Sequence, residues 1–99
     1  MCCAMVDHDI PPELYTLFLS SLEKSLQRIR ESDAGGDLES LSFHAHAIRG
    51  TCGAYGHEEL SVQAGLIEDL ADAGSASEAH EAVTRFCHSA QAVMDASGS

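Results

Sequence analysis

The chain has 99 residues, 44% of them hydrophobic, which is enough for one domain with a modest core. Its formal net charge of −11, with only five Lys and Arg residues, argues against a nucleic-acid partner and against binding to an anionic membrane surface. Aromatic residues make up only 5% and Trp is absent, so the core must consist mainly of aliphatic side chains and Ala. This composition favours packed helices over a β-sandwich.

We expect no targeting signal in the N-terminal segment. Residues 1–9 are expected to form a loose end or a short extra helical turn, with Met5, Val6 and Ile10 available to cap the domain. A basic segment followed by a hydrophobic core is missing, and no stretch approaches the roughly 18–20 apolar residues of a membrane span. We therefore expect a cytoplasmic protein.

The first predicted helix starts at Pro11-Pro12-Glu13, because Pro is tolerated in the first turn and Glu suits the positive end of the helix dipole. Its apolar residues recur mostly at steps of three and four, which is the spacing of one helix face. The helix should end at residues 32–36, where Gly35 and Gly36 break the pattern. The apolar positions are Leu14, Leu17, Phe18, Leu22, Leu26 and Ile29.

The second predicted helix starts after Asp37, a suitable N-cap, and runs to about Tyr55, with Gly56 as its C-terminal stop. At about 100° per residue, His46 falls roughly 120° from the centre of the apolar stripe and therefore on the solvent side. His44 lies nearer the edge of the stripe. The stripe itself consists of Leu38, Leu41, Ala45, Ile48 and Cys52.

Two further helices follow. The third begins at residues 57–59 and ends at Ala73-Gly74, and the fourth begins with the capping-box pattern of Ser75 and Glu78. Their apolar positions are Leu60, Ala64, Ile67 and Leu70 or Ala71, and then Ala79, Ala82, Val83, Phe86, Ala90, Val93 and Ala96. Four amphipathic helices with short turns predict an all-α, antiparallel four-helix bundle. We expect one domain over residues 1–99, with the bundle at about 11–96.

The segment around His46 contains features that helix stability does not explain. Arg49, Gly50 and Gly53 lie one to two turns after His46, although Gly costs about 1 kcal/mol relative to Ala inside a helix. Small residues beside an exposed imidazole would let a partner approach the ring, and a nearby cation would hold negative charge there. An imidazole nitrogen is nucleophilic when neutral, which suits it to carrying a phosphoryl group.

The pattern His46-x-Ile48-Arg49-Gly50, followed by Gly56, resembles the signature of histidine-containing phosphotransfer (HPt) domains. That signature reads roughly His-x-(Leu/Phe)-Lys-Gly, with a second Gly six residues after the first. Arg49 stands where Lys is usual, which keeps the charge but changes its geometry. Residues 52–55 also depart from the Ser/Ala-rich run that is common in the family.

The resemblance implies a four-helix bundle and a carrier role in a multistep His-Asp phosphorelay. It implies that His46 accepts the phosphoryl group, Arg49 stabilises its charge and Gly50 gives the partner access. Ser42, Phe43, Ala47 and Gly53 would belong to the docking surface. The partners implied are receiver domains of response regulators and hybrid sensor kinases, which would bring the Mg²⁺. The chain lacks a Gly-rich phosphate loop, so we expect a monomeric carrier without a cofactor or ATP site of its own.

Two alternatives remain open from the sequence. One is a non-catalytic helical adaptor in which His46 is never phosphorylated, and the other is a metal-binding bundle. The metal reading lacks support, because His44 and His46 are two apart and point to different sides of a helix. Glu58, Glu59, Glu68, Asp69 and Asp72 are expected to be solvated helix faces. Cys2, Cys3, Cys52 and Cys87 form no Cys-x-x-Cys pair and are expected to be reduced.

Overall fold

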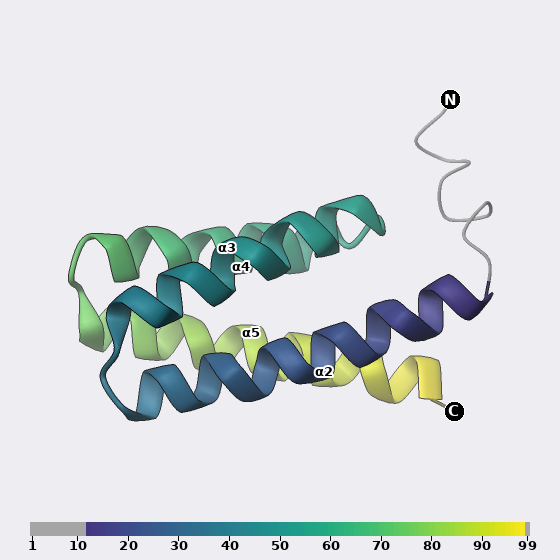
Figure 1. The fold of residues 1–99 in the computed structure, drawn as a ribbon, viewed down its shortest axis with the longest axis horizontal. Coiled ribbons are helices and arrows are strands. Elements are labelled where there is room, and N and C mark those ends of the chain that lie inside the picture. Colours follow the sequence, from purple (N-terminus) through teal and green to yellow (C-terminus); the bar gives the residue numbers. More distant parts are fainter. Residues whose placement is uncertain (1–11, 99) are drawn as a thin grey trace.

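The structure is a computed structural model that describes residues 12–98, and these residues form four helices. The helices are α2 (Pro12–Ala34), α3 (Leu38–Ala54), α4 (Glu58–Asp72) and α5 (Ala76–Gly98). Successive helices run in opposite directions, with α3 and α4 forming one half of the bundle and α2 and α5 the other (Figure 1). The predicted all-α four-helix bundle is confirmed. The expectations for residues 1–11, including those for Cys2 and Cys3, lie outside the described residues.

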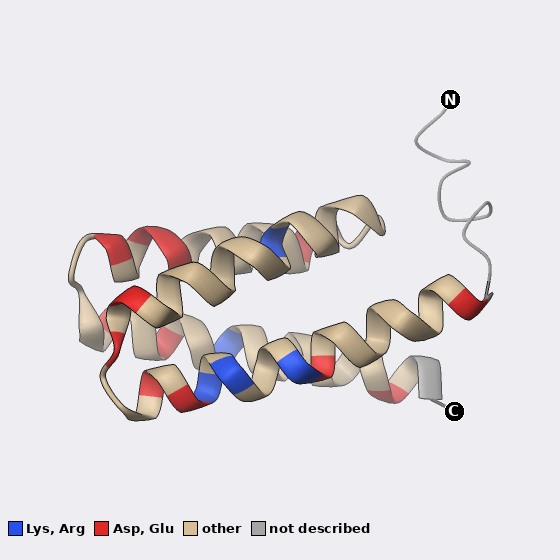
Figure 2. Ribbon diagram, in the orientation of Figure 1, with Lys and Arg blue, Asp and Glu red and all other residues tan. Residues whose placement is uncertain are grey.

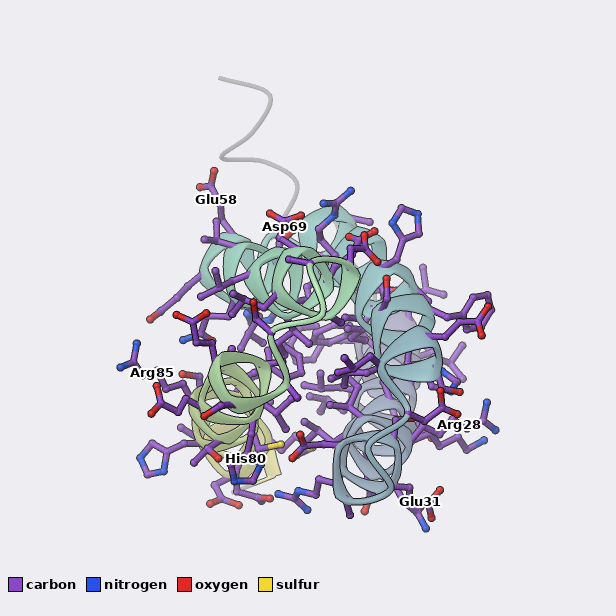
Figure 3. The ribbon with its side chains drawn as sticks, turned by 90° about the vertical axis from the view of Figure 1, so that its left-hand side faces the viewer. Arg28, Glu31, Glu58, Asp69, His80 and Arg85 are labelled. Atoms are coloured by element: carbon purple, nitrogen blue, oxygen red, sulfur yellow. The ribbon has the colours of Figure 1, made fainter. Side chains whose placement is uncertain are left out.

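The core lies where the four apolar stripes meet, as the end-on view of the bundle shows (Figure 3). Phe18 and Phe86 are its largest buried side chains, and most of the remaining volume is filled by Leu, Ile and Ala. Ala at many contact positions lets helices approach closely, in keeping with the low aromatic content. The other buried hydrophobic residues are Leu22, Leu26, Ile29, Leu41, Ala45, Ile48, Cys52, Leu60, Ala64, Ile67, Ala71, Ala79, Ala82, Val83, Cys87 and Ala90.

Three positions of the predicted stripes are wrong. Leu17 is 60% exposed and Leu14 is also exposed, whereas Tyr15 and Leu19 are partly buried against the core. The three-residue step from Leu14 suggested that Leu17 shares the buried face of the helix. At about 100° per residue, however, Leu17 lies roughly 140° from the buried Leu22. Ala96, near the C-terminal end of α5, is likewise exposed.

The ends of α3 follow the sequence closely. The carboxylate of Asp37 accepts a hydrogen bond from the Ser40 backbone N–H at 3.1 Å, which satisfies one of the free donors of the first turn. At the other end Gly56 adopts a φ of 82°, and the His57 N–H donates to the Cys52 carbonyl at 2.9 Å. A side chain at position 56 would be strained in this left-handed conformation, so Gly56 fixes the turn into α4.

An aromatic cluster joins this turn to α2. The Phe18 ring stacks on Tyr55 and on His57, with centroid distances of 4.8 and 5.0 Å. The Tyr15 hydroxyl lies 2.9 Å from His57 Nε2, in hydrogen-bonding contact. The cluster therefore holds the α3–α4 turn against the N-terminal half of α2. Within residues 12–98, no helix is both long enough and apolar enough to cross a membrane.

Cys52 and Cys87 are free thiols, as expected, and both are buried. Burial raises the pKa of the Cys52 thiol from about 9.0 to about 12. Between these values the unfolded chain loses the proton and the folded chain keeps it, so this group's contribution to stability is complete below pH 9 and falls as the pH rises toward 12.

We therefore predict that Cys52 resists a thiol reagent at pH 8 in the folded chain and reacts once the chain is unfolded in denaturant. The free energy of unfolding should also fall above about pH 9 more steeply in the wild type than in Cys52→Ala. Cys52→Ala is the matched control, because it removes the titrating group from the same buried position. Rapid labelling of folded Cys52 would contradict this account.

Candidate functional site

His46 lies in the middle of α3 with its side chain 63% exposed. Ala45 and Ile48, which lie on the core-facing side of the same helix, are fully buried. The helix is thus anchored by its apolar stripe, and the imidazole projects from the flank, as the sequence predicted. An exposed ring on a rigid helix is accessible to a second molecule without any opening of the fold.

A regular row of contacts joins the flank of α3 to α4. Ser42 donates a hydrogen bond to Asp72, and His46 pairs with Glu68. Further along, Arg49 lies against Gly65, and Gly53 lies against Ser61. In each pair the two residue numbers sum to 114, which is the signature of an antiparallel register centred on position 57. The register is therefore fixed along four successive turns.

Glu68 is the centre of this row. Its Oε2 lies 2.8 Å from His46 Nδ1, and its Oε1 lies 3.2 Å from an Arg49 guanidinium nitrogen. The Glu68 side chain is only 16% exposed, so the carboxylate is shielded while the imidazole remains open to solvent. One carboxylate thus holds both the nucleophile candidate and its neighbouring cation.

The contact with Glu68 decides which nitrogen of His46 is free. An ionised carboxylate can only accept hydrogen bonds, so His46 Nδ1 carries the proton and donates it. The lone pair of the neutral ring is then on Nε2, the atom farther from Glu68. A carboxylate in this position also stabilises positive charge that develops on the ring when Nε2 forms a bond.

The expectation that the acids of α4 are all solvated is wrong for Glu68. Its neighbours Glu58, Glu59 and Asp69 are exposed, but Glu68 faces α3 and is shielded there. Asp72 is exposed yet accepts the hydrogen bond from Ser42 at 2.5 Å. The signal that could have identified Glu68 is the register itself, since a turn centred on position 57 places residue 68 opposite residue 46.

The two glycines near Arg49 have different surroundings. A Cβ built on Gly50 would have no neighbouring atom within 4 Å, so the space beside it is open. A Cβ on Gly65 would lie 3.2 Å from Arg49 Cδ, so Gly65 provides the room in which the Arg49 side chain lies. Ser61 also donates a hydrogen bond to the Arg49 carbonyl at 3.0 Å. Arg49 is therefore supported from α4 at both its backbone and its side chain.

The predicted docking residues of α3 lie outside its buried stripe. Phe43 is 68% exposed, Ala47 and Gly53 are exposed, and Ser42 is partly shielded by its bond to Asp72. On α4, Val62 and Leu66 are exposed hydrophobic residues that the sequence analysis did not single out. His44 is half-buried with its ring edge-on to Phe43. Within the described part of the chain, no group of three or more His, Cys, Asp or Glu side chains is placed to hold a metal ion.

The comparison with protein families decides the identity of this arrangement. The model of the Hpt domain family matches residues 13–96, which is most of the chain and includes His46, Arg49 and Glu68. The chain belongs to the Hpt domain family. Membership supports a role in histidine phosphotransfer within phosphorelays, and Hpt domains in general interact with receiver domains. No curated protein and no solved structure matches the chain.

The pairing of Glu68 with His46 predicts that Glu68→Ala slows phosphorylation of His46 by a small donor such as phosphoramidate. The loss of one charge-assisted hydrogen bond at this exposed site should lower the rate about tenfold. Glu68→Gln should lose less, because the amide oxygen still accepts from Nδ1. The rate is measured by intact mass, with the modified residue located by fragmentation.

The matched control is Asp72→Ala, which removes the neighbouring carboxylate contact in the same row without touching His46. It should leave the rate at His46 within about twofold of the wild type. Equal rates for Glu68→Ala and the wild type would show that Glu68 does not position the ring.

Proposed function

We propose that this Hpt domain carries a phosphoryl group on His46 Nε2 between aspartyl receiver domains of a multistep phosphorelay. The observation that carries the proposal is the exposed His46 ring, held through Nδ1 by the shielded carboxylate of Glu68, within the region that matches the Hpt family. The arrangement presents a single nucleophilic atom, in a fixed tautomer, on a rigid helix.

The transfer step balances without a base from this chain. The Nε2 lone pair attacks the phosphorus of a receiver's phospho-aspartate, the P–O bond to the aspartate breaks, and its electron pair returns to the carboxylate. The ring keeps its Nδ1 proton and becomes cationic, and Glu68 stabilises that charge through the contact of 2.8 Å. Transfer to a second receiver is the reverse reaction with a different aspartate.

Arg49 supplies the positive charge that the phosphoryl group needs on this chain. Glu68, Asp69 and Asp72 make the surrounding surface of α4 acidic, and Arg49 is the one Lys or Arg within α3 and α4. Its side chain is 44% exposed, so the guanidinium can turn from Glu68 toward a group on Nε2. The partner receiver would contribute the Mg²⁺ that this proposal expects at the transfer step.

The open space at Gly50 and the exposed side chains of Phe43 and Ala47 form a docking surface around His46. Transfer requires the phosphorus on the receiver's aspartate to come in line with His46 Nε2, so the receiver must approach the imidazole closely. Side chains that protrude on the same flank of α3 would hinder that approach. Gly50 therefore serves access rather than folding.

The proposal is tested by incubating the chain with a phosphorylated receiver domain and measuring the label on the wild type, His46→Gln and His44→Gln. We expect acid-labile, base-stable label on the wild type and on His44→Gln, and none on His46→Gln. Label on His46→Gln would mean that the carrier is another histidine. Absence of label from every chain, with several receivers tried, would favour the adaptor function instead.

Gly50→Ala separates access from stability. We predict that it raises the free energy of unfolding by about 0.4 to 1 kcal/mol, because a Cβ at position 50 meets no atom of the protein and Ala restricts the unfolded chain. Transfer from a receiver should nevertheless become slower. Thermal unfolding and the receiver assay measure the two effects in the same preparation.

The control for this variant is the small donor phosphoramidate, which does not need the docking surface. Its rate of reaction at His46 should be the same in Gly50→Ala and in the wild type. If both donors slow equally, the variant has disturbed the ring of His46 and the access role is wrong.

A further inference from the structure

A second exposed histidine of this chain is paired in the same way as His46. His80, in α5, has its Nδ1 2.5 Å from Asp33 Oδ2 near the C-terminal end of α2. The His80 side chain is 67% exposed and that of Asp33 is 12% exposed. For His46 and Glu68 the corresponding values are 63% and 16%. Among the histidines that the structure describes, these two are the ones whose rings pair with a carboxylate.

The chemical consequence is the same at both positions. The carboxylate of Asp33 accepts the proton on His80 Nδ1, which leaves the lone pair of the neutral ring on Nε2. The shielded carboxylate also stabilises positive charge on the ring after Nε2 has reacted. His80 is thus a nucleophile of fixed tautomer. The residues that follow His80 do not repeat the motif that follows His46.

The second pair lies on the other half of the bundle. His46 and Glu68 join α3 to α4, whereas His80 and Asp33 join α5 to α2. In the end-on view, His80 lies at the bottom beside α5 while Asp69 of α4 lies at the top (Figure 3). A molecule that occupies the docking surface around His46 would leave His80 exposed.

The half that carries His80 holds most of the basic residues of the chain, although the seven Asp and Glu residues of α2 and α5 outnumber them. Four of the five Lys and Arg residues lie in α2 and α5, and α4 contains none (Figure 2). An open hollow of about 530 Å³ adjoins His80, and its polar lining consists of Arg30, Asp33, Thr84, His88 and Gln91. A small phosphate-bearing molecule in this hollow would meet a guanidinium and hydrogen-bond donors next to a nucleophilic nitrogen.

We propose that His80 is a second phosphoryl-accepting site, served by small phosphoramidate donors rather than by a receiver domain. The Nε2 lone pair of His80 attacks the phosphorus of the donor, and the P–N bond of the donor breaks. The donor nitrogen leaves as ammonia with the protons that it already carries. His80 Nδ1 keeps its proton toward Asp33, and Arg30 is the cation that lines the hollow beside the new phosphoryl group.

The test uses the full chain with His46→Gln, so that the site proposed at His46 cannot react. Phosphoramidate is added, and the gain of phosphoryl groups is followed by intact mass, with fragmentation to locate the modified residue. We expect label at His80. The rate should fall about fivefold or more in His46→Gln/His80→Gln, and about fivefold in His46→Gln/Asp33→Asn, which keeps the size of residue 33 but removes its charge.

His44 provides the control, because it is a histidine of α3 that does not line the hollow. Label at His80 should appear in His46→Gln/His44→Gln at the rate seen in His46→Gln. Circular dichroism and thermal unfolding of each variant show that the bundle is retained. An unchanged rate in the His80 or Asp33 variant, or a loss in the His44 variant equal to that in the His80 variant, would overturn the proposal. None of these outcomes depends on whether a receiver phosphorylates His46.

Discussion

The pairing of Glu68 with His46 depends on the register between α3 and α4. Glu68 reaches both His46 Nδ1 and the Arg49 guanidinium because the two helices are held antiparallel around the turn at Gly56 and His57. Phe18, stacked on Tyr55 and His57, holds that turn against α2. A slip of one residue in the register would rotate Glu68 away from the ring. The site is therefore a property of the packed bundle and not of α3 alone.

This dependence explains how a small helical domain can keep an exposed histidine in a defined state. A histidine that is 63% exposed on an isolated helix would rotate freely and exchange its proton between both nitrogens. Here a shielded carboxylate restricts both the orientation and the tautomer, while the opposite edge of the ring stays in solvent. Such preorganisation removes a reorganisation cost that would otherwise fall on the transfer step. His80 and Asp33 form the same kind of imidazole–carboxylate pair between α2 and α5.

The sequence predicted the fold well, because each helix carries its own start and stop signals. Asp37 caps α3 and Gly56 ends it, and the stripe from Leu41 to Cys52 is buried as predicted. The first helix was predicted less well, because Leu17 fits a three-residue step from Leu14 yet lies on the exposed face. Local spacing gives the period of a helix, but the direction of the core depends on the whole helix.

The candidate site could be predicted only in part for a related reason. His46, Arg49 and Gly50 are adjacent in sequence, so a motif reveals them together. Glu68 lies 22 positions later, among acids of similar appearance, and its role follows from the pairing of two helices. Asp33 and His80 are 47 positions apart and belong to α2 and α5. Contacts of this kind depend on tertiary packing, which no local pattern of residues contains.

The most direct measurement is the tautomer of His46 in the folded chain, read from long-range ¹H–¹⁵N correlations of the neutral imidazole. The account predicts a proton on Nδ1 and a free lone pair on Nε2 in the wild type, with mixed tautomers in Glu68→Ala. After phosphorylation, the same spectrum should place the phosphoryl group on Nε2. A proton on Nε2 in the free wild-type chain, or a phosphoryl group on Nδ1, would contradict the account.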